Sequence, residues 1–312
     1  MKIIVSGGDG FIGKNLVKRL HQLENEVIVI DNHITSYKEN DKLPNVVHID
    51  ESIERINIDS FEDVDLIFHL ASVASPLVYK KDFKNVYNPN VKGTEVLIEL
   101  AKKCGSKLIY TSTSEVYGTL NEQLTNYEGI KENTVSLSHL LTERSIYPTS
   151  KKMGEELVYN YIRNGGDGLI LRLFNVYGPD MDVRNNGYGR VIPNFINAIS
   201  NDQALTIYGD GNQIRSFVWI DDMIDALINL LNYDGDNKVL NLGNPIETSI
   251  NDLAGTLFSI FGKNTGIKYV PRDIDDPLWR RPNTTVVEKS INWKPKVSLL
   301  EGLKRIIGTY YE

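Results

Sequence analysis

Short runs of apolar and β-branched residues recur through the first half of the chain, separated by longer stretches with helical periodicity. Strands are predicted at residues 3–5, 26–30, 46–49, 66–70, 107–110 and 168–173, and helices at 11–23, 83–104 and 147–163. The strand runs do not alternate strictly between apolar and polar residues. That pattern is typical of strands buried on both faces, so it predicts an α/β protein with a parallel sheet wrapped by helices.

The pattern changes after Asn175, where glycine, proline and asparagine separate shorter elements, as at Gly178-Pro179 and Gly209-Asp210-Gly211. The chain shows no internal repeat and no low-complexity linker. We therefore expect a smaller lobe that packs against the first one. In a doubly wound sheet a ligand binds beyond the carboxyl ends of the strands, which here places it between the two lobes.

The composition is that of a globular protein, with 312 residues, 41% hydrophobic and 24% charged. Its apolar runs are too short to span a membrane, and the first residues lead directly into a strand without a basic and apolar leader. The net charge is −7 with no block of lysine or arginine, so no nucleic-acid partner is expected. A single cysteine, Cys104, excludes an internal disulfide, and the five histidines lack ligand spacing. We expect a cytoplasmic, metal-free protein.

A glycine-rich turn, Gly7-Gly8-Asp9-Gly10-Phe11-Ile12-Gly13, follows the first predicted strand and leads into a helix. The N–H groups at that helix start would face a pyrophosphate. Asp31 ends the next strand, about 20 residues further on, where a carboxylate binds an adenosine ribose and repels a 2′-phosphate. No arginine follows nearby to accommodate that phosphate, so NAD is favoured over NADP. For the glycine loop and Asp31, the alternative is a structural turn with an incidental acid. Asp50, which ends the third strand, is a further candidate near the adenine, although aspartates are common at strand ends.

Tyr147 and Lys151 lie four residues apart, on one face of a predicted helix. The lysine charge and a nicotinamide cation would both stabilise a phenolate, which makes Tyr147 a candidate general base. Tyr127 and Lys131 have the same spacing. Tyr127, however, lies in a run rich in asparagine and glycine that predicts a loop, so the catalytic role is assigned to Tyr147 and Lys151.

The other half of the site is expected at the end of the fifth strand, in the run Thr111-Ser112-Thr113-Ser114-Glu115-Val116-Tyr117-Gly118. Hydroxyl groups at the carboxyl end of a strand, followed by an acid, are unusual for a simple sheet edge. The alternative is a hydroxyl-rich turn with a structural role only.

Together these motifs resemble those of the extended short-chain dehydrogenases/reductases, in the NAD-dependent epimerase/dehydratase family, which act on nucleotide sugars. The matching segments follow in the same order over nearly the whole chain: the glycine loop, Asp31, Asn90-x-x-Gly93-Thr94, Tyr147 with Lys151, and Leu173-Phe174-Asn175-Val176-Tyr177-Gly178-Pro179. The resemblance implies a Rossmann-type doubly wound parallel sheet over residues 1–173, with a return segment near 216–242. Residues 174–312 would mainly form a smaller α/β lobe that binds the nucleotide sugar. A homodimer through helices 83–104 and 147–163 is also implied.

The resemblance further implies which residues contact the ligands. NAD would be bound by Gly7, Gly10, Phe11, Ile12, Asp31, Asn32, Asp50, Leu70, Ala71, Ser72, Asn90, Thr111, Tyr147 and Lys151. The substrate would be bound by Tyr79, Asn175, Arg190, Tyr208, Arg215 and Arg280. Arg190 and Arg215 would hold the diphosphate, which suits the planar guanidinium fork, and Tyr208 would lie near the base. The catalytic residues would be Thr113, Ser114, Glu115, Tyr147, Lys151 and Arg280.

Within the family, several segments are most similar to those of the UDP-glucuronate decarboxylases, also called UDP-xylose synthases. These segments are His69-Leu70-Ala71-Ser72-Val73-Ala74-Ser75-Pro76 with Tyr79, the 111–118 run, Asp275-Asp276-Pro277 leading into Arg280-Arg281-Pro282, and Asn292-Trp293-Lys294-Pro295. Two positions depart from that pattern. Residues 148–150 are Pro-Thr-Ser where decarboxylases usually carry acidic residues and a glycine, and Val73 stands where proline is common.

The implied activity is NAD-dependent decarboxylation of UDP-glucuronate to UDP-xylose through a 4-keto intermediate. NAD would accept a hydride from C4 and later return it, while Tyr147 takes the 4-hydroxyl proton and Thr113 orients that hydroxyl. The ketone would make the sugar a β-keto acid that loses CO₂ without a metal, with Ser114, Glu115 and Arg280 around the carboxylate-bearing carbon.

Three alternatives stay open: a UDP-sugar 4-epimerase, a nucleotide-sugar 4,6-dehydratase and a catalytically silent NAD-binding protein. Epimerases usually lack an acid at the position of Glu115. Dehydratases of glucose nucleotides usually carry Thr-Asp-Glu at 113–115, whereas GDP-mannose 4,6-dehydratases share the Thr-Ser-Glu found here.

Overall fold

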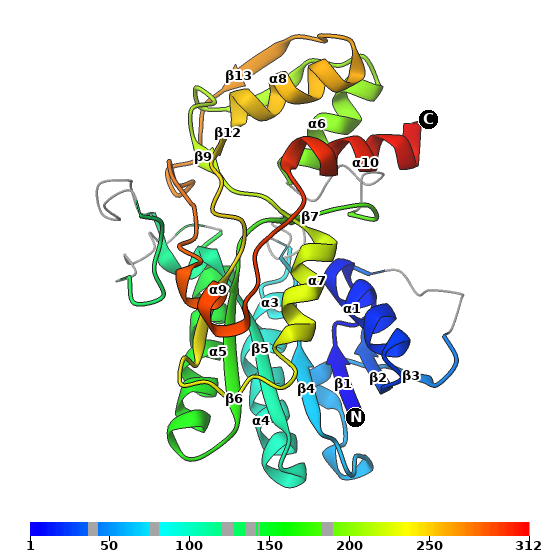
Figure 1. The fold of residues 1–312 in the computed structure, drawn as a ribbon. Coiled ribbons are helices and arrows are strands. Elements are labelled where there is room, and N and C mark those ends of the chain that lie inside the picture. Colours follow the sequence, from blue (N-terminus) through cyan, green and yellow to red (C-terminus); the bar gives the residue numbers. More distant parts are fainter. Residues whose placement is uncertain are drawn as a thin grey trace.

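A central sheet with helices on both faces forms the larger lobe of the protein, and a smaller lobe lies across one end of the strands (Figure 1). The computed structural model describes residues 1–36, 43–74, 81–119, 128–134, 142, 144–181 and 190–311. Tyr79 and Tyr127, both named above, lie outside these residues.

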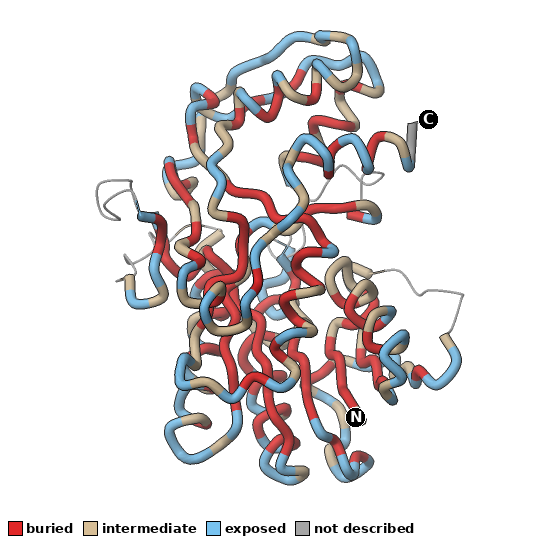
Figure 2. The backbone as a smooth tube through the Cα atoms, viewed as in Figure 1, coloured by how far each residue is buried: buried red, intermediate tan, exposed pale blue. Residues whose placement is uncertain are grey.

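The central sheet has seven parallel strands in the order β11-β6-β5-β4-β1-β2-β3. Their bounds are β1 (Lys2–Ser6), β2 (Glu26–Asp31), β3 (Val46–Asp50), β4 (Leu66–His69), β5 (Lys107–Thr113), β6 (Gly168–Leu173) and β11 (Val239–Leu242). Buried residues run along nearly the whole length of the central strands, because both faces are covered (Figure 2). The predicted doubly wound parallel sheet is therefore confirmed.

Successive residues of β1 point to opposite faces of the sheet and enter different cores. Ile3 and Val5 pack in one hydrophobic cluster with residues of α1 and α7, whereas Ile4 packs in another with residues of α4 and α5. The helices that cover the sheet are α1 (Phe11–Gln22), α4 (Gly93–Cys104), α5 (Ile146–Arg163) and α7 (Ile220–Asn229).

The stretch predicted as one helix over 83–104 changes pitch along its length. It begins as α3 (Lys84–Tyr87), passes through a π-helical turn η3 (Asn88–Lys92) and continues as α4. Pro89 lies in this turn and has no N–H to donate, which removes one helical hydrogen bond and favours a local change of geometry.

The second half of the chain returns to the central sheet before it completes the smaller lobe. Strand β11 pairs with β6, with Leu240 opposite Leu171, and α7 packs beside α1. The other elements are η1 (Ile53–Arg55), η2 (Ile58–Ser60), η4 (Ser114–Tyr117), β7 (Val176–Tyr177), α6 (Val191–Ser200), β8 (Leu205–Tyr208), β9 (Ile214–Arg215), β10 (Val218–Trp219), β12 (Thr248–Ser249), α8 (Ile250–Phe261), β13 (Ile267–Val270), α9 (Thr285–Ile291) and α10 (Leu299–Tyr311). Among the helices that the structure describes, none has the length and apolar character needed to cross a bilayer.

Candidate active site

A cleft of about 1090 Å³ follows the carboxyl edge of the central sheet, below the smaller lobe. Parallel sheets of this kind bind their ligands at this edge. Most residues predicted to contact ligands line it: Gly7, Gly10, Phe11, Ile12, Asp31, Asn32, Leu70, Ala71, Ser72, Thr111, Thr113, Ser114, Glu115, Tyr147, Lys151, Asn175, Arg190, Tyr208, Arg215 and Arg280. The volume slightly exceeds the range for small-molecule pockets, about 300–1,000 Å³, which suits a dinucleotide together with a second nucleotide.

The glycine loop, Gly7–Gly13, forms a concave surface, here called the glycine cradle, that side chains at the glycine positions would fill. Gly7 adopts a left-handed conformation with φ of 72°, and a Cβ atom at Gly13 would lie 2.1 Å from the carbonyl oxygen of Gly7. Helix α1 starts after Gly10 with no side-chain cap, so its first N–H groups stay available for an anion. These features fit the pyrophosphate of a dinucleotide.

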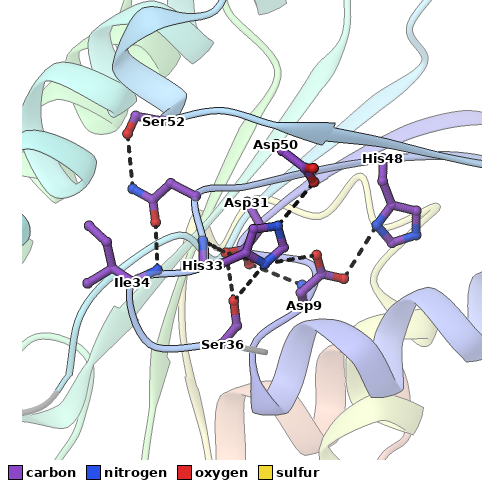
Figure 3. Close-up of polar contacts among 9 residues, drawn as sticks. Asp9, Asp31, His33, Ile34, Ser36, His48, Asp50 and Ser52 are labelled. Atoms are coloured by element: carbon purple, nitrogen blue, oxygen red, sulfur yellow. Dashed lines mark hydrogen bonds and ion pairs between the residues drawn. The ribbon is translucent and has the colours of Figure 1, made fainter. Parts of the chain in front are cut away.

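The adenosine end of the cleft is formed around Asp31 at the end of β2 (Figure 3). Its carboxylate accepts hydrogen bonds from the backbone N–H of Asp9 at 3.1 Å, the backbone N–H of His33 at 2.9 Å and the hydroxyl of Ser36 at 2.8 Å. Asp50 does not line the cleft, and its carboxylate lies 3.1 Å from Nε2 of His33. In the structure Asp50 contacts the loop after β2, and its contact with the cofactor stays a prediction.

Tyr147 and Lys151 enter the cleft from the first turns of α5, and both side chains are buried. The Nζ atom of Lys151 donates to the carbonyl oxygen of Thr111 at 2.7 Å, which fixes α5 against the end of β5. Burial lowers the pKa of Lys151 to about 7, although nearby Glu155 acts to raise it.

His69 and Asn90 form a buried support behind this pair. His69 contacts the Ser6 hydroxyl at 2.8 Å and the Thr94 hydroxyl at 3.1 Å, and burial together with the charge of Lys151 lowers its pKa to about 3. Asn90 donates to the Ser150 hydroxyl at 2.9 Å and does not line the cleft. The contact of Asn90 with the cofactor stays a prediction; in the structure its side chain joins η3 to α5 through Ser150.

An arginine and a glutamate line the cleft near the start of α5. Arg280 is buried and donates to the carbonyl oxygen of Gly118 at 3.4 Å, while Glu115, the second residue of η4, also lines the cleft. Burial lowers the pKa of Arg280 to about 10, and the charge of Glu115 acts in the opposite direction. Arg215 is paired with Asp276 at 2.7 Å, so it is already oriented by an acid from the 271–280 segment.

Two further predicted substrate residues are held by contacts within the protein. The Asn175 side chain donates to the carbonyl oxygen of Ser216 at 2.9 Å. The guanidinium of Arg190 lies 5.9 Å from the centre of the Phe11 ring, which places it next to the glycine loop. Tyr208 is 56% exposed on β8 and presents its ring at the rim of the cleft.

Arg144 is a residue of the cleft that the sequence did not reveal. It lies three positions before Tyr147, lines the cleft and contributes to the electrostatic environment of Arg215 and Arg280. A single arginine in an irregular segment has no periodic or motif signal, so only the fold brings it to the site.

A buried polar network connects the elements that carry the candidate catalytic residues. Arg172 on β6 donates two hydrogen bonds to Glu155 on α5, at 2.8 and 2.7 Å, and one to the Tyr117 hydroxyl on η4, at 2.9 Å. Tyr117 donates in turn to Asn241 on β11 at 2.8 Å. The network therefore fixes the Ser114–Tyr117 turn relative to the helix that carries Tyr147 and Lys151.

The model of the NAD dependent epimerase/dehydratase family matches residues 3–243. The chain belongs to this family. The glycine cradle and Asp31 are the features that fit its cofactor, NAD.

Curated relatives match over nearly the full length of the chain. UDP-glucuronic acid decarboxylase 5 of Arabidopsis thaliana is 40% identical over 311 residues, which cover 97% of this chain and 87% of that protein. UDP-glucuronic acid decarboxylase 1 of the same organism is 37% identical, over 99% of this chain and 70% of that protein.

Among solved structures, UDP-glucose 4-epimerase from Thermotoga maritima with UDP-glucose superposes with a TM-score of 0.89 at 30% identity, covering 99% of this chain and 98% of that one. UDP-glucuronic acid 4-epimerase from Bacillus cereus, in complex with UDP-glucuronic acid and NAD, superposes with a TM-score of 0.86 at 28% identity, covering 99% and 100%. The fold is therefore shared by relatives with different reaction outcomes.

Proposed function

We propose that the protein is an NAD-dependent enzyme that decarboxylates UDP-glucuronate to UDP-xylose through a 4-keto intermediate. The proposal rests mainly on the position of Arg280. Its guanidinium is buried in the cleft beside Glu115 and makes one hydrogen bond to the part of the chain that the structure describes. A buried cation that lines a cleft suits a substrate carboxylate. The curated decarboxylases at 37–40% identity support the same assignment.

Two groups of side chains in the cleft act on neighbouring atoms of the sugar. In the first group, Tyr147 takes the proton of the sugar 4-hydroxyl, Thr113 orients that hydroxyl, and Lys151 stabilises the phenolate. Bound NAD supplies the hydride acceptor and donor for C4. In the second group, Arg280 orients the carboxylate while Ser114 and Glu115 face the carbon that carries it. The C4 ketone accepts the electrons released with CO₂ as an enolate, and protonation at C5 follows.

The main alternative is a UDP-sugar 4-epimerase, because solved epimerases share the fold. A substrate carboxylate does not by itself separate the two reactions, since the Bacillus cereus 4-epimerase is also described with UDP-glucuronic acid. The mass of the product does separate them. Decarboxylation removes CO₂, epimerisation leaves the mass unchanged, and dehydration removes one water from a hexose nucleotide.

The test is to incubate purified protein with UDP-glucuronate and NAD⁺ and to follow CO₂ release and the nucleotide products by mass spectrometry. We expect a UDP-pentose from the wild type and at least a 100-fold lower rate from Tyr147→Phe, since general-base catalysis typically contributes about 10²–10⁴-fold. Tyr269→Phe, at an exposed tyrosine of the smaller lobe, is the matched control and should keep full activity. A product of unchanged mass would replace the decarboxylase assignment with an epimerase.

The homodimer expected from the sequence is a proposal of the same kind. Met153 and Tyr159 on α5 are 43% and 45% exposed, so this helix carries apolar surface that a partner helix can cover. Light scattering coupled to size-exclusion chromatography should give about twice the 35.3 kDa chain mass, and Tyr159→Glu should shift it toward the monomer.

A further inference from the structure

Asp9 places a second carboxylate at the ribose end of the cofactor cleft. The residue follows two glycines of the loop, is 8% exposed and lines the cleft. Its backbone N–H donates to the Asp31 carboxylate at 3.1 Å, which keeps the two acids next to each other.

Two histidines hold the Asp9 carboxylate in place, one on each side (Figure 3). Nδ1 of His48, on β3, lies 3.5 Å from Oδ1 of Asp9, and Nδ1 of His33 lies 3.7 Å from Oδ2. His33 also reaches Asp50 with Nε2, at 3.1 Å. The carboxylate is therefore fixed by β3 and by the loop after β2 as well as by its own loop.

The conformation of His33 supports a specific role for these contacts. Its φ of 57° is in the left-handed region, which a residue with a side chain adopts at a cost and which persists only when the surroundings hold it. Burial raises the pKa of the Asp9 carboxyl, as does neighbouring Asp31, and His48 and His33 act in the opposite direction. The imidazoles thus offset part of the cost of keeping two acids side by side.

Asp31 by itself is well supplied with hydrogen-bond donors. Three groups already donate to it, namely the N–H groups of Asp9 and His33 and the hydroxyl of Ser36. Donors of this kind partly neutralise the charge that a ligand experiences. Asp9 adds a second carboxylate to the same wall of the cleft.

We propose that Asp9 is a specificity-determining residue for the cofactor, which acts together with Asp31 to admit NAD and to exclude NADP. A ribose hydroxyl can donate to a carboxylate, whereas a 2′-phosphate carries about −1.5 to −2 charge and is repelled by both acids. Exclusion of NADP is then shared between two residues, one in the glycine loop and one at the end of β2.

The test measures dissociation constants of NAD⁺ and NADP⁺ by isothermal titration calorimetry, with full-length wild type, Asp31→Asn, Asp9→Asn and the double variant. Removal of one carboxylate charge next to the 2′-phosphate should lower the NADP/NAD ratio of dissociation constants roughly tenfold. We expect Asp9→Asn to lower the ratio in the wild type and again in the Asp31→Asn background. Asp202→Asn, at an exposed acid of the smaller lobe, removes the same charge far from the cleft and should leave the ratio unchanged.

Three results would overturn the proposal. The first is an NADP/NAD ratio that Asp9→Asn changes less than twofold in both backgrounds, and the second is no measurable NADP⁺ binding by the double variant. The third is an equal loss of affinity for both cofactors, because it indicates a structural role of the loop. Asp9→Ser replaces Asp9→Asn if the latter lowers the melting temperature. No sugar nucleotide is needed, so the outcome is independent of the proposed decarboxylase activity.

Discussion

The buried pair of Arg172 and Glu155 gives the sharpest test of how the site is held together. Their side chains are 8% and 3% exposed and meet through two hydrogen bonds at 2.8 and 2.7 Å. Arg172→Met removes the cation but keeps much of the apolar stem, and it leaves the Glu155 carboxylate buried with Lys152 as its remaining ion-pair partner at 3.1 Å. Breaking a buried pair from one side typically costs about 3–5 kcal/mol of unfolding free energy.

The size of this loss should depend on pH. In the wild type, burial opposes ionisation of Glu155, but its hydrogen bonds and the charge of Arg172 outweigh that effect and lower its pKa. A lowered pKa in the folded state stabilises the fold above the ordinary pKa of the group and is lost as pH falls through the folded value. Without Arg172, burial should instead raise the pKa of Glu155, so folding then requires a proton and stability falls as pH rises.

We therefore expect Arg172→Met to destabilise the protein by about 3–5 kcal/mol at pH 7.5 and by clearly less near pH 4.5, measured by urea unfolding followed by circular dichroism. Arg305→Met is the matched control, because Arg305 is 48% exposed and pairs with Glu301 at 3.0 Å. Such surface pairs are worth about 0–1 kcal/mol. A loss below about 1 kcal/mol for Arg172→Met, or an equal loss at both pH values, would refute the reasoning.

Three other changes test separate parts of the site. Gly13→Ala should weaken NAD⁺ binding at least tenfold in calorimetry, because its Cβ would lie 2.1 Å from the Gly7 carbonyl oxygen. The control Gly255→Ala has open space around it and should bind NAD⁺ as the wild type does. Equal affinities of the two variants would contradict the role of the glycine loop in NAD⁺ binding. Arg280→Gln should reduce kcat/KM for UDP-glucuronate roughly 30-fold or more, as expected for a lost charge-assisted contact of about 2 kcal/mol, and an unchanged value would remove its carboxylate role. Tyr117→Phe should leave NAD⁺ affinity unchanged but lower kcat, because the Tyr117 hydroxyl joins Arg172 to Asn241. An unchanged kcat would show that the network does not position η4.

The sequence by itself determined those features that depend on residues close together in the chain. The strand–glycine loop–helix unit, the acid at the end of β2 and the spacing of Tyr147 and Lys151 follow from local periodicity and backbone geometry. These features sufficed to predict the parallel sheet, the cofactor and the edge of the sheet where the cleft lies.

Only the tertiary structure decided the contacts between distant segments. Tyr117 and Asn241 are separated by 124 positions, and no pattern along the chain predicts that they share a hydrogen bond. The same holds for Asp9 with His48, and for Asn90 with Ser150, which are separated by 60 positions. Periodicity states which face of an element is buried, but not which polar groups meet there. Such groups find their partners only when whole elements pack, because each buried donor must then meet an acceptor.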